Sequence, residues 1–207
     1  MVRGFFIVCM AKKLLLVRHG EVGKEYLDRY IGSTDISMSP HGREQIKAAQ
    51  PLLQSSTPDV CISSTMKRCR ETAAILTEGS GMELVFDPDL REIDFGRWEG
   101  MTFEEILKGF PNDIDRWIEF RPEFTFPGGE KIGDFQARIQ GVAGRLAANS
   151  ADTILVCTHG GVIRLLICHF LGLPPWQYVL FKVQRASLTT IELFGESGML
   201  SGLNQCV

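Results

Sequence analysis

The sequence predicts an α/β fold in which helices cover both faces of a mostly parallel sheet that has an antiparallel edge. Two features of the pattern indicate this architecture. Short apolar runs alternate with segments of helical periodicity along most of the 207 residues, and this alternation is typical of parallel βαβ units. The last two apolar runs are separated by Gly195-Glu196-Ser197-Gly198, which favours a hairpin and therefore antiparallel strands. We expect a three-layer α/β/α sandwich.

The strands and helices of this sandwich can be placed along the chain from periodicity and turn residues. Strands are expected at 13–17, 59–63, 83–86, 153–157, 187–194 and 199–205. Helices are expected at 40–54, 66–78, 102–109, 112–120, 131–149 and 161–171. Ser39 followed by Pro40 is a helix start signal, because serine caps the free N–H groups and proline suits the first turn. Ser64 or Thr65 can cap the second helix.

Residues 11–207 are expected to form a single domain, and residues 1–10 to be an N-terminal extension of little structural weight. The rhythm of strands and helices breaks between residues 87 and 130, a stretch rich in glycine and proline that holds two of the three tryptophans. This stretch is too long for a simple connection between elements. We interpret it as an insertion that shapes a binding site, and we expect its closing glycine turn to open the helix over 131–149.

The charge and the cysteine pattern exclude several classes of protein. A formal net charge of -3 provides no basic field for nucleic acid and no polybasic membrane anchor. No apolar stretch approaches the length of a membrane span. The six cysteines contain no C-x-x-C pair, and we interpret them as buried, reduced thiols of a cytoplasmic protein, not as disulfides or a metal site. Because the overall charge is not basic, any phosphate binding must come from a few converging arginines.

Two predicted strands end in histidine and glycine. Leu14-Leu15-Leu16-Val17 leads into Arg18-His19-Gly20, and Ile154-Leu155-Val156-Cys157-Thr158 leads into His159-Gly160-Gly161. In open α/β sheets ligands bind at the carboxyl edge of the strands, where these residues are expected to lie. Arginine offers a planar fork of donors to phosphate oxygens, neutral imidazole is a nucleophile, and glycine lets a ligand approach the backbone. Two such strand ends are difficult to explain by packing alone.

Other segments offer a second arginine and an acid. Arg68 lies in the first turn of the helix predicted over 66–78, where free N–H groups and the helix dipole favour anions. Arg70, two residues further on, points from another face of that helix and is the competing candidate. A phosphoryl transfer from an alcohol also needs an acid to protonate the departing oxygen. Glu92, Asp94 and Glu99 all qualify by composition, and the residues alone do not distinguish among them.

Together these segments resemble the histidine phosphatase superfamily, in its phosphoglycerate mutase-like branch. The motifs occur in the family order from about Lys13 to about Phe194, as Arg18-His19-Gly20-Glu21, Ser63 to Ala73, Leu90 to Gly100, and Thr158-His159-Gly160-Gly161-Val162-Ile163-Arg164. The resemblance implies a phosphoglycerate mutase-like form of the α/β/α sandwich. It also implies that His19 is a nucleophile that forms a phosphohistidine.

The same resemblance assigns roles to the remaining candidates. It implies that Arg18, Arg68 and His159 bind the phosphoryl oxygens, and it favours Arg68 over Arg70. It points to Glu92 as the general acid, which later activates the hydrolytic water. The resemblance also implies that Arg18, Gly32, Arg68 and Gly160 bind the substrate. Because cationic donors neutralise the charge on the phosphoryl oxygens, we expect no metal and no other cofactor.

Two departures from the family pattern concern the residues that follow the first motif. Val22 stands where the family often has threonine, and Glu25 stands where it often has an asparagine that touches phosphate. The sequence looks most similar to the α-ribazole phosphatases of cobalamin biosynthesis. This likeness rests on the segment Arg18 to Val22, followed by Tyr30 to Asp35 and Pro127 to Glu130. The extra arginines and the different acid loop of the glycerate mutases are not found in the sequence.

The predicted activity is hydrolysis of a small-molecule phosphate monoester, namely α-ribazole 5'-phosphate or a related nucleoside or sugar phosphate. The first alternative is a phosphoryl transfer of the phosphoglycerate mutase type. The second is a non-catalytic module that binds phosphorylated ligands, and the presence of His19, Arg68, Glu92 and His159 argues against it. No nucleic acid or membrane partner is expected. The sequence is compatible with a homodimer and does not specify one.

Aromatic residues and two further arginines have a plain structural interpretation as well as a functional one. Trp98, Trp117 and Phe124 could line a substrate pocket, but aromatic side chains belong to the core by default. Arg29 and Arg164 could reach a substrate, but we interpret them first as members of ordinary ion pairs.

Overall fold

The protein is built around one mixed sheet of six strands, in the order β3-β2-β4-β1-β5-β6. The computed structural model describes residues 12–54 and 56–206, so the predictions for residues 1–10 and Cys9 lie outside the described residues. The strands are β1 (Lys12–Arg18), β2 (Val60–Ser64), β3 (Glu83–Asp87), β4 (Thr153–Thr158), β5 (Leu188–Phe194) and β6 (Ser197–Gln205). β5 runs antiparallel to both of its neighbours, whereas the other pairs are parallel. The predicted sheet with an antiparallel edge is confirmed.

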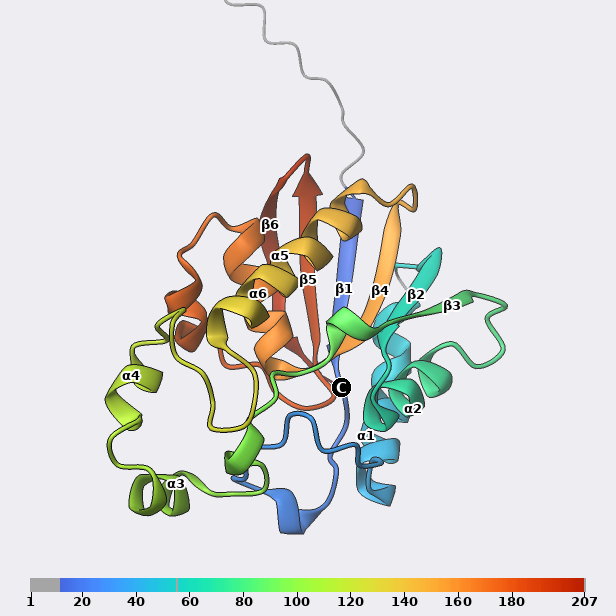
Figure 1. Ribbon diagram of the computed structural model, residues 1–207. Coiled ribbons are helices and arrows are strands. Elements are labelled where there is room, and N and C mark those ends of the chain that lie inside the picture. Colours follow the sequence, from blue (N-terminus) through green and yellow to red (C-terminus); the bar gives the residue numbers. More distant parts are fainter. Residues whose placement is uncertain (1–11, 55, 207) are drawn as a thin grey trace, which may run out of the picture.

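Helices cover both faces of this sheet (Figure 1). The α-helices are α1 (Pro40–Ala49), α2 (Lys67–Leu76), α3 (Phe103–Gly109), α4 (Ile114–Ile118), α5 (Ile132–Ala148) and α6 (Gly160–Phe170). Short 3-10 helices are η1 (Lys24–Tyr26), η2 (Gln50–Leu53), η3 (Pro88–Leu90), η4 (Gly96–Trp98) and η5 (Pro175–Leu180). α5 and α6 pack on one face, and α1 and α2 pack on the other. The predicted three-layer sandwich is therefore confirmed.

The apolar run of β1 is explained by burial on both of its sides. Leu14 and Leu16 belong to the hydrophobic cluster beneath α5 and α6, whereas Leu15 and Val17 belong to the cluster beneath α1 and α2. All four are at most 2% exposed. A central strand covered by helices on both faces needs a continuous apolar run, in place of the alternation seen in half-exposed strands. The burial fixes where β1 ends and so fixes the position of the residues that follow it.

The helix ends agree with the sequence in one place and differ in two. Ser39 caps α1 by accepting a hydrogen bond from the N–H of Gly42 at 2.9 Å, as predicted. α1 stops at Ala49 and continues only as a 3-10 turn, because Pro51 lacks an N–H and disfavours a longer α-helix. Neither Ser64 nor Thr65 caps α2, whose N-cap is Met66. The N–H of Lys67 instead donates to Asp35 Oδ1 at 2.7 Å, so a distant loop supplies the cap.

Residues 87–130 form the segment that carries α3 and α4, to one side of the sheet's lower edge in Figure 1. Trp98 is fully buried at its centre and packs edge-on against Trp117 and Phe126, with ring centroids 5.2 Å apart in both pairs. An ion pair between Glu130 and Arg138 ties the end of the segment to α5. α5 begins at Ile132, directly after the glycine turn, as the sequence predicted.

The described cysteines are free thiols. Cys61, Cys69, Cys157 and Cys168 are buried, as predicted, whereas Cys206 is exposed near the end of β6 and differs from that prediction. Of the helices within 12–54 and 56–206, none combines the length and the apolar character needed to cross a bilayer.

Candidate active site

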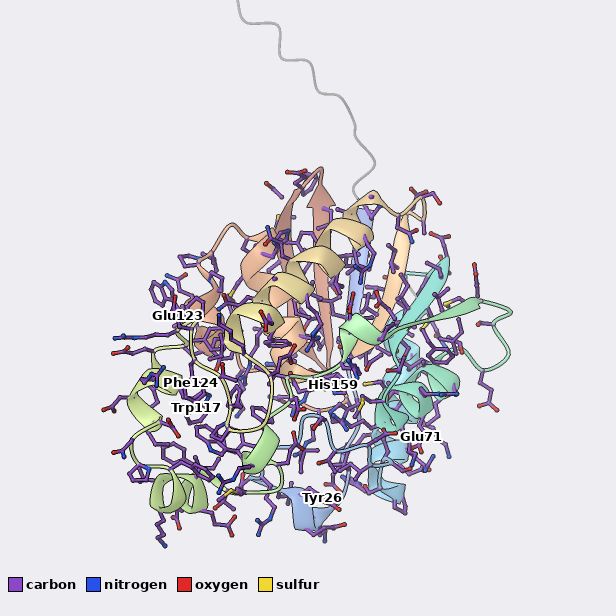
Figure 2. The ribbon with its side chains drawn as sticks, viewed as in Figure 1. Tyr26, Glu71, Trp117, Glu123, Phe124 and His159 are labelled. Carbon is purple, nitrogen blue, oxygen red and sulfur yellow. The ribbon has the colours of Figure 1, made fainter. Side chains whose placement is uncertain are left out.

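The polar segments singled out in the sequence meet at the carboxyl edge of the sheet. Arg18 ends β1, Arg68 lies in the first turn of α2, and His159 follows β4 as the N-cap of α6. β1 and β4 are adjacent parallel strands in which Arg18 lies opposite Thr158. This pairing brings two segments together that are far apart in the sequence. Figure 2 labels His159 at the point where the strands end.

His19 is a neutral imidazole with one nitrogen free for attack. Its side chain is buried, and its Nδ1 lies 2.8 Å from the carbonyl oxygen of Gly20. Since a carbonyl oxygen only accepts, Nδ1 carries the proton and Nε2 keeps its lone pair. Burial, followed by the positive charges of Arg68 and Arg18, lowers the pKa of His19 well below its ordinary value of 6.5. His19 Nε2 is therefore available as a nucleophile at neutral pH.

Arg68 is fully buried and held by three acceptors. Its Nη1 and Nη2 donate to the carbonyl oxygens of Thr34 and Gly32, each at 2.8 Å, and its Nε donates to His159 Nδ1 at 3.3 Å. A guanidinium has five N–H bonds, so donors remain for an anion after these contacts. Arg70 is exposed and lies over the ring of Phe86. The geometry favours Arg68, the choice implied by the resemblance.

His159 accepts a hydrogen bond from Arg68. Arginine only donates, so His159 Nδ1 accepts and its Nε2 carries the proton, which is donated to Ser64 Oγ at 3.0 Å. Burial and the charge of Arg68 lower the pKa of His159 well below 6.5. Its ring meets that of His19 edge-on, with centroids 5.2 Å apart. Direct donation from His159 to a phosphoryl oxygen stays a prediction.

Arg18 provides an unsatisfied buried donor beside His19. Its Nη1 donates to the carbonyl oxygen of Val183 at 2.6 Å, whereas its Nε is buried without a partner in the described part of the chain. Burial, with the nearby charge of Arg185 as the next cause, lowers the pKa of Arg18 to about 10, which leaves it protonated at neutral pH. An orphaned buried donor costs free energy until an acceptor arrives, so this position favours an anion.

The three carboxylates left open by the sequence occupy different places. Glu92 lines the cavity at the site, and its Oε2 accepts from the N–H of Gly161 at 2.9 Å. A Cβ at position 161 would lie too close to Glu92 Oε1, so glycine there lets the carboxylate approach α6 without a shift of its side chain. Asp94 accepts from Ser33 Oγ and from the N–H of Gly96 inside its own loop. Of the three carboxylates, Glu92 is the one that lines the cavity.

Glu99 serves the site indirectly by holding the segment that holds Arg68. It accepts from the backbone N–H groups of Gly32, Ser33 and Thr34 and from the hydroxyl of Thr34. The carbonyl oxygens of Gly32 and Thr34 in turn accept from Arg68. Both backbone groups of Gly32 are thus engaged, and its contact with a substrate stays a prediction. Gly160 differs, because it lines the cavity beside the Arg18 guanidinium.

A cavity of about 190 Å³ opens beside Arg18 and Glu92. Half of its lining residues are aromatic, and the lining consists of Arg18, Tyr30, Ile31, Glu92, Ile93, Phe95, Trp117, Phe120, Phe126, Phe135, Gly160, Gly161, Arg164 and Tyr178. Six of the fourteen come from residues 87–130, and the interpretation of that stretch as an insertion that shapes a site stays a prediction. Trp117 lines this cavity, whereas Trp98 and Phe124 belong to the core; Figure 2 shows Trp117 and Phe124 beside α4.

Several cavity residues escaped the sequence analysis or had another interpretation there. Tyr30 opens the Tyr30 to Asp35 segment that carries part of the family resemblance, but no role was predicted for it, and Tyr178 lies in η5, which no motif marks. Burial raises the pKa of Tyr178 to about 12, so its phenol remains a donor. Arg29 forms an ion pair with Glu105, as expected. Arg164 departs from its expected ion pair, because it lines the cavity and its buried Nε lacks a partner among the described residues.

The two departures from the family pattern lie outside the cavity. Val22 is buried and Glu25 is exposed, and neither belongs to the cavity lining. No grouping of three His, Cys, Asp or Glu side chains suited to a metal ion occurs within residues 12–54 and 56–206.

An α/β/α sandwich with a buried, neutral histidine between two arginines at one sheet edge defines a class of phosphate-binding proteins. The chain belongs to the histidine phosphatase superfamily (branch 1), whose pattern matches residues 14–205. The resemblance stated from the motifs is confirmed.

Relatives with different printed activities share this fold. The chain is 31% identical to Phosphoserine phosphatase 1 of Hydrogenobacter thermophilus over 93% of this chain and 92% of the relative. It superimposes on an alpha-ribazole phosphatase from Shigella flexneri with a TM-score of 0.83 and 26% identity, covering 93% of this chain and 96% of that one. A mycobacterial glucosyl-3-phosphoglycerate phosphatase, solved with VO3, gives a TM-score of 0.82 and 29% identity over 94% and 99% of the two chains. The relatives thus share a phosphatase name and differ in substrate.

Proposed function

We propose that the protein is a phosphomonoesterase that works through a phosphohistidine formed on His19. The observation that carries the proposal is the hydrogen bond from His19 Nδ1 to the carbonyl oxygen of Gly20, which leaves Nε2 with its lone pair in a buried position where Arg68 and Arg18 lower the pKa of the imidazole. A nucleophile of this kind lets one difficult transfer proceed as two easier ones. The family membership and the phosphatase names of the relatives support the same reaction.

In the first step, His19 Nε2 attacks phosphorus while the bond from phosphorus to the alcohol oxygen breaks. The electron pair of that bond leaves with the oxygen, and Glu92 supplies the proton that converts it to an alcohol. Glu92 is the carboxylate in the cavity lining, and its contact with Gly161 aims it at this region. Arg18 and Arg68 offset the charge on the phosphoryl oxygens, so no step of the proposal runs through a metal.

In the second step, water attacks the phosphohistidine and releases inorganic phosphate. Glu92, now ionised, takes a proton from that water, and the bond between phosphorus and Nε2 breaks to restore neutral His19. A dianionic phosphoryl group also favours a proton on His159, which could then donate to it where it now accepts from Arg68. The resting protonation states are regenerated after each turnover.

The substrate is the finer part of this proposal. The motifs that resemble α-ribazole phosphatases, together with the structural likeness to the Shigella flexneri protein, favour α-ribazole 5'-phosphate or a related nucleoside or sugar phosphate. A small molecule suits the cavity of about 190 Å³. A role in cobalamin biosynthesis and a cytoplasmic location belong to the same proposal.

The direct test is to trap the phosphoenzyme. We expect radiolabelled phosphate from a labile donor to appear on the protein as an acid-labile, alkali-stable phosphohistidine, and to be absent from His19→Ala. That variant is expected to lose on the order of 10⁵-fold in kcat/KM. His41→Ala, which removes an exposed histidine on α1, is the matched control and should retain activity.

Three outcomes would contradict the proposal in different ways. Turnover of His19→Ala at the rate of the unmodified protein would exclude the nucleophile. Transfer of the phosphoryl group to a second alcohol faster than phosphate release would indicate a mutase. Binding of phosphorylated ligands without a phosphoenzyme or turnover would indicate a binding module.

A further inference from the structure

Arg164 is a cation in the cavity that the proposed reaction does not use. It lies on α6 and lines the cavity together with Arg18 and Glu92. Its Nε is buried and has no hydrogen-bond partner in the described part of the chain. Its nearest recorded interaction is with the ring of Tyr178, whose centroid lies 6.0 Å from Cζ. A buried guanidinium donor without an acceptor is costly, so this position is suited to a ligand that supplies one.

The charges in the cavity leave Arg164 without a counter-charge. At the phosphoryl end, Arg18 and Arg68 balance the two negative charges of a phosphate monoester dianion. Glu92 is the carboxylate among the cavity-lining residues, but the proposed reaction requires it to be protonated when the substrate binds. One positive charge therefore remains uncompensated in a partly enclosed space, where electrostatic interactions are stronger than in water.

The place of Arg164 on α6 corresponds to the leaving group and not to the phosphoryl group. Gly160 begins α6 and abuts the Arg18 guanidinium. Arg164 is four residues further along the same helix, about one turn or 5.4 Å away, on the same face. Aromatic walls surround this part of the cavity, with Tyr30 and Tyr178 as further donors. The separation matches an anionic group a few bonds from the ester oxygen.

We propose that Arg164 binds a second anionic group, a carboxylate on the departing alcohol, and so selects phosphate esters of hydroxy acids over those of neutral alcohols. This inference rests on the proposed phosphohistidine reaction, and among phosphate monoesters it points to sugar acids and related hydroxy acids in place of α-ribazole 5'-phosphate, whose alcohol carries no carboxylate. A planar guanidinium binds a carboxylate through two parallel hydrogen bonds. A second phosphate group offers the same chemistry, and the experiment separates the two.

The test compares substrates that differ by the carboxylate alone. O-phosphoserine is paired with O-phosphoethanolamine, and 3-phosphoglycerate with glycerol 3-phosphate. We expect kcat/KM to favour the carboxylate member of each pair by about 10- to 150-fold, the ratio that a hydrogen bond to a charged group provides. In Arg164→Met this ratio should fall towards one, and in Arg164→Lys it should fall partway. Arg70→Met, which removes an exposed arginine of α2, should leave the ratio unchanged.

A second measurement does not depend on how well the variants fold. D-glycerate and glycerol are compared as competitive inhibitors of the unmodified protein, and stronger inhibition by D-glycerate supports the proposal. Equal inhibition by the two compounds contradicts it.

Other outcomes overturn the inference while leaving the proposed function intact. Equal losses in Arg164→Met on both members of a pair would mean that Arg164 contacts the phosphoryl group. A preference for fructose 1,6-bisphosphate over fructose 6-phosphate, without one for carboxylates, would assign the site to a second phosphate. Preferred turnover of α-ribazole 5'-phosphate, insensitive to Arg164→Met, would assign it to a neutral alcohol. Failure of the proposed function itself has a different signature, the absence of a phosphohistidine on His19 with every substrate.

Discussion

Two arginines of the candidate site, Arg68 and Arg164, are held in opposite ways. At the phosphoryl end, Arg68 is fully buried and donates to Thr34, Gly32 and His159 before any ligand arrives. In the neighbouring cavity, Arg164 has a buried Nε that lacks any partner among the described residues. The first cation is held in place by the protein, whereas the second waits for an acceptor from the ligand.

The two halves of the site, the phosphoryl end and the cavity, also come from different parts of the chain. The phosphoryl end stands on β1, β4 and the first turn of α2, which the sheet holds in register. The cavity is walled largely by residues 87–130 and by the loop around η5, through aromatic packing. A rigid phosphoryl end suits a reaction that all members of a family share. Cavity walls built from other segments can differ between members, so that each accepts a different leaving group. The relatives fit this division, because their names differ in substrate and agree in phosphate release.

Arg68→Met should cause the largest effect of the remaining variants, because it removes the best-ordered cation of the phosphoryl end. We expect kcat/KM to fall about 10³-fold, within the range for loss of a catalytic arginine or oxyanion donor. The loss should be nearly the same for aryl and alkyl phosphates, since the phosphoryl group is common to them. Steady-state kinetics on both substrates measures it. A loss restricted to one leaving group would place Arg68 in the other half of the site.

Glu92→Gln tests the boundary between the halves. An amide cannot deliver a proton, so kcat/KM should fall by about 10²- to 10⁴-fold for alkyl phosphates, whose alkoxides are poor leaving groups. The loss should be much smaller for p-nitrophenyl phosphate, whose phenolate departs unaided. Asp94→Asn provides the control, because Asp94 does not line the cavity and its carboxylate is engaged by Ser33 Oγ and the N–H of Gly96. If leaving-group dependence appeared in Asp94→Asn and not in Glu92→Gln, the acid would be assigned to the wrong carboxylate.

Glu99→Gln tests whether the halves are connected. Glu99 belongs to the 87–130 segment, yet it accepts from Gly32 and Thr34, whose carbonyl oxygens hold Arg68. Loss of its charge should weaken these bonds and cost about 1–3 kcal/mol of unfolding free energy. We expect kcat/KM to fall about tenfold as Arg68 becomes less well ordered, a smaller loss than for Arg68→Met. Thermal unfolding and kinetics would be measured together, and an unchanged kcat/KM would show that the halves are independent.

A last effect, on stability and not on catalysis, is a pH dependence of the free energy of unfolding that originates at the phosphoryl end. The pKa values of His19 and His159 lie well below 6.5 in the folded protein, while unfolding returns each to about 6.5. Below that pH the unfolded chain binds more protons than the folded one, so the free energy of unfolding falls as the solution is acidified. Each histidine contributes up to about 1.4 kcal/mol per pH unit until its folded pKa is reached.

Urea unfolding between about pH 7 and pH 5 would measure this slope, and His19→Gln should reduce it. His41→Gln, at an exposed position on α1, should leave the slope as it is. A slope that is the same in both variants would mean that the buried state of His19 does not determine the effect.

The fold and the phosphoryl end could be predicted from the sequence for a common physical reason. Strands buried on both faces leave long apolar runs, and the residues that follow such runs must lie at the sheet edge, as Arg18 and His159 do. The choice of Glu92 over Asp94 and Glu99 required the family resemblance, because three nearby carboxylates in a loop look alike until the hydrogen bonds are seen.

The cavity was much less predictable. Tyr30 and Tyr178 reach it from loops whose paths depend on packing between distant segments, and no local periodicity records such packing. The sequence also did not predict that Asp35 caps α2. The reason is the same, because the acceptor comes from another part of the chain. Arg164 was expected to form an ion pair with an acid. The sequence does not record which side chains surround Arg164, and in the structure Glu92 is the one carboxylate among the described residues that line the cavity.

The concentration of arginines at one mouth of an otherwise acidic protein has a kinetic consequence. The chain has a formal net charge of -3, yet Arg18, Arg68, Arg164 and Arg185 gather near the same strand ends. Such a charge separation steers small anions towards the mouth and weakens as ionic strength rises. The same field retains inorganic phosphate after turnover. The arginines therefore speed the capture of substrate and slow the release of product.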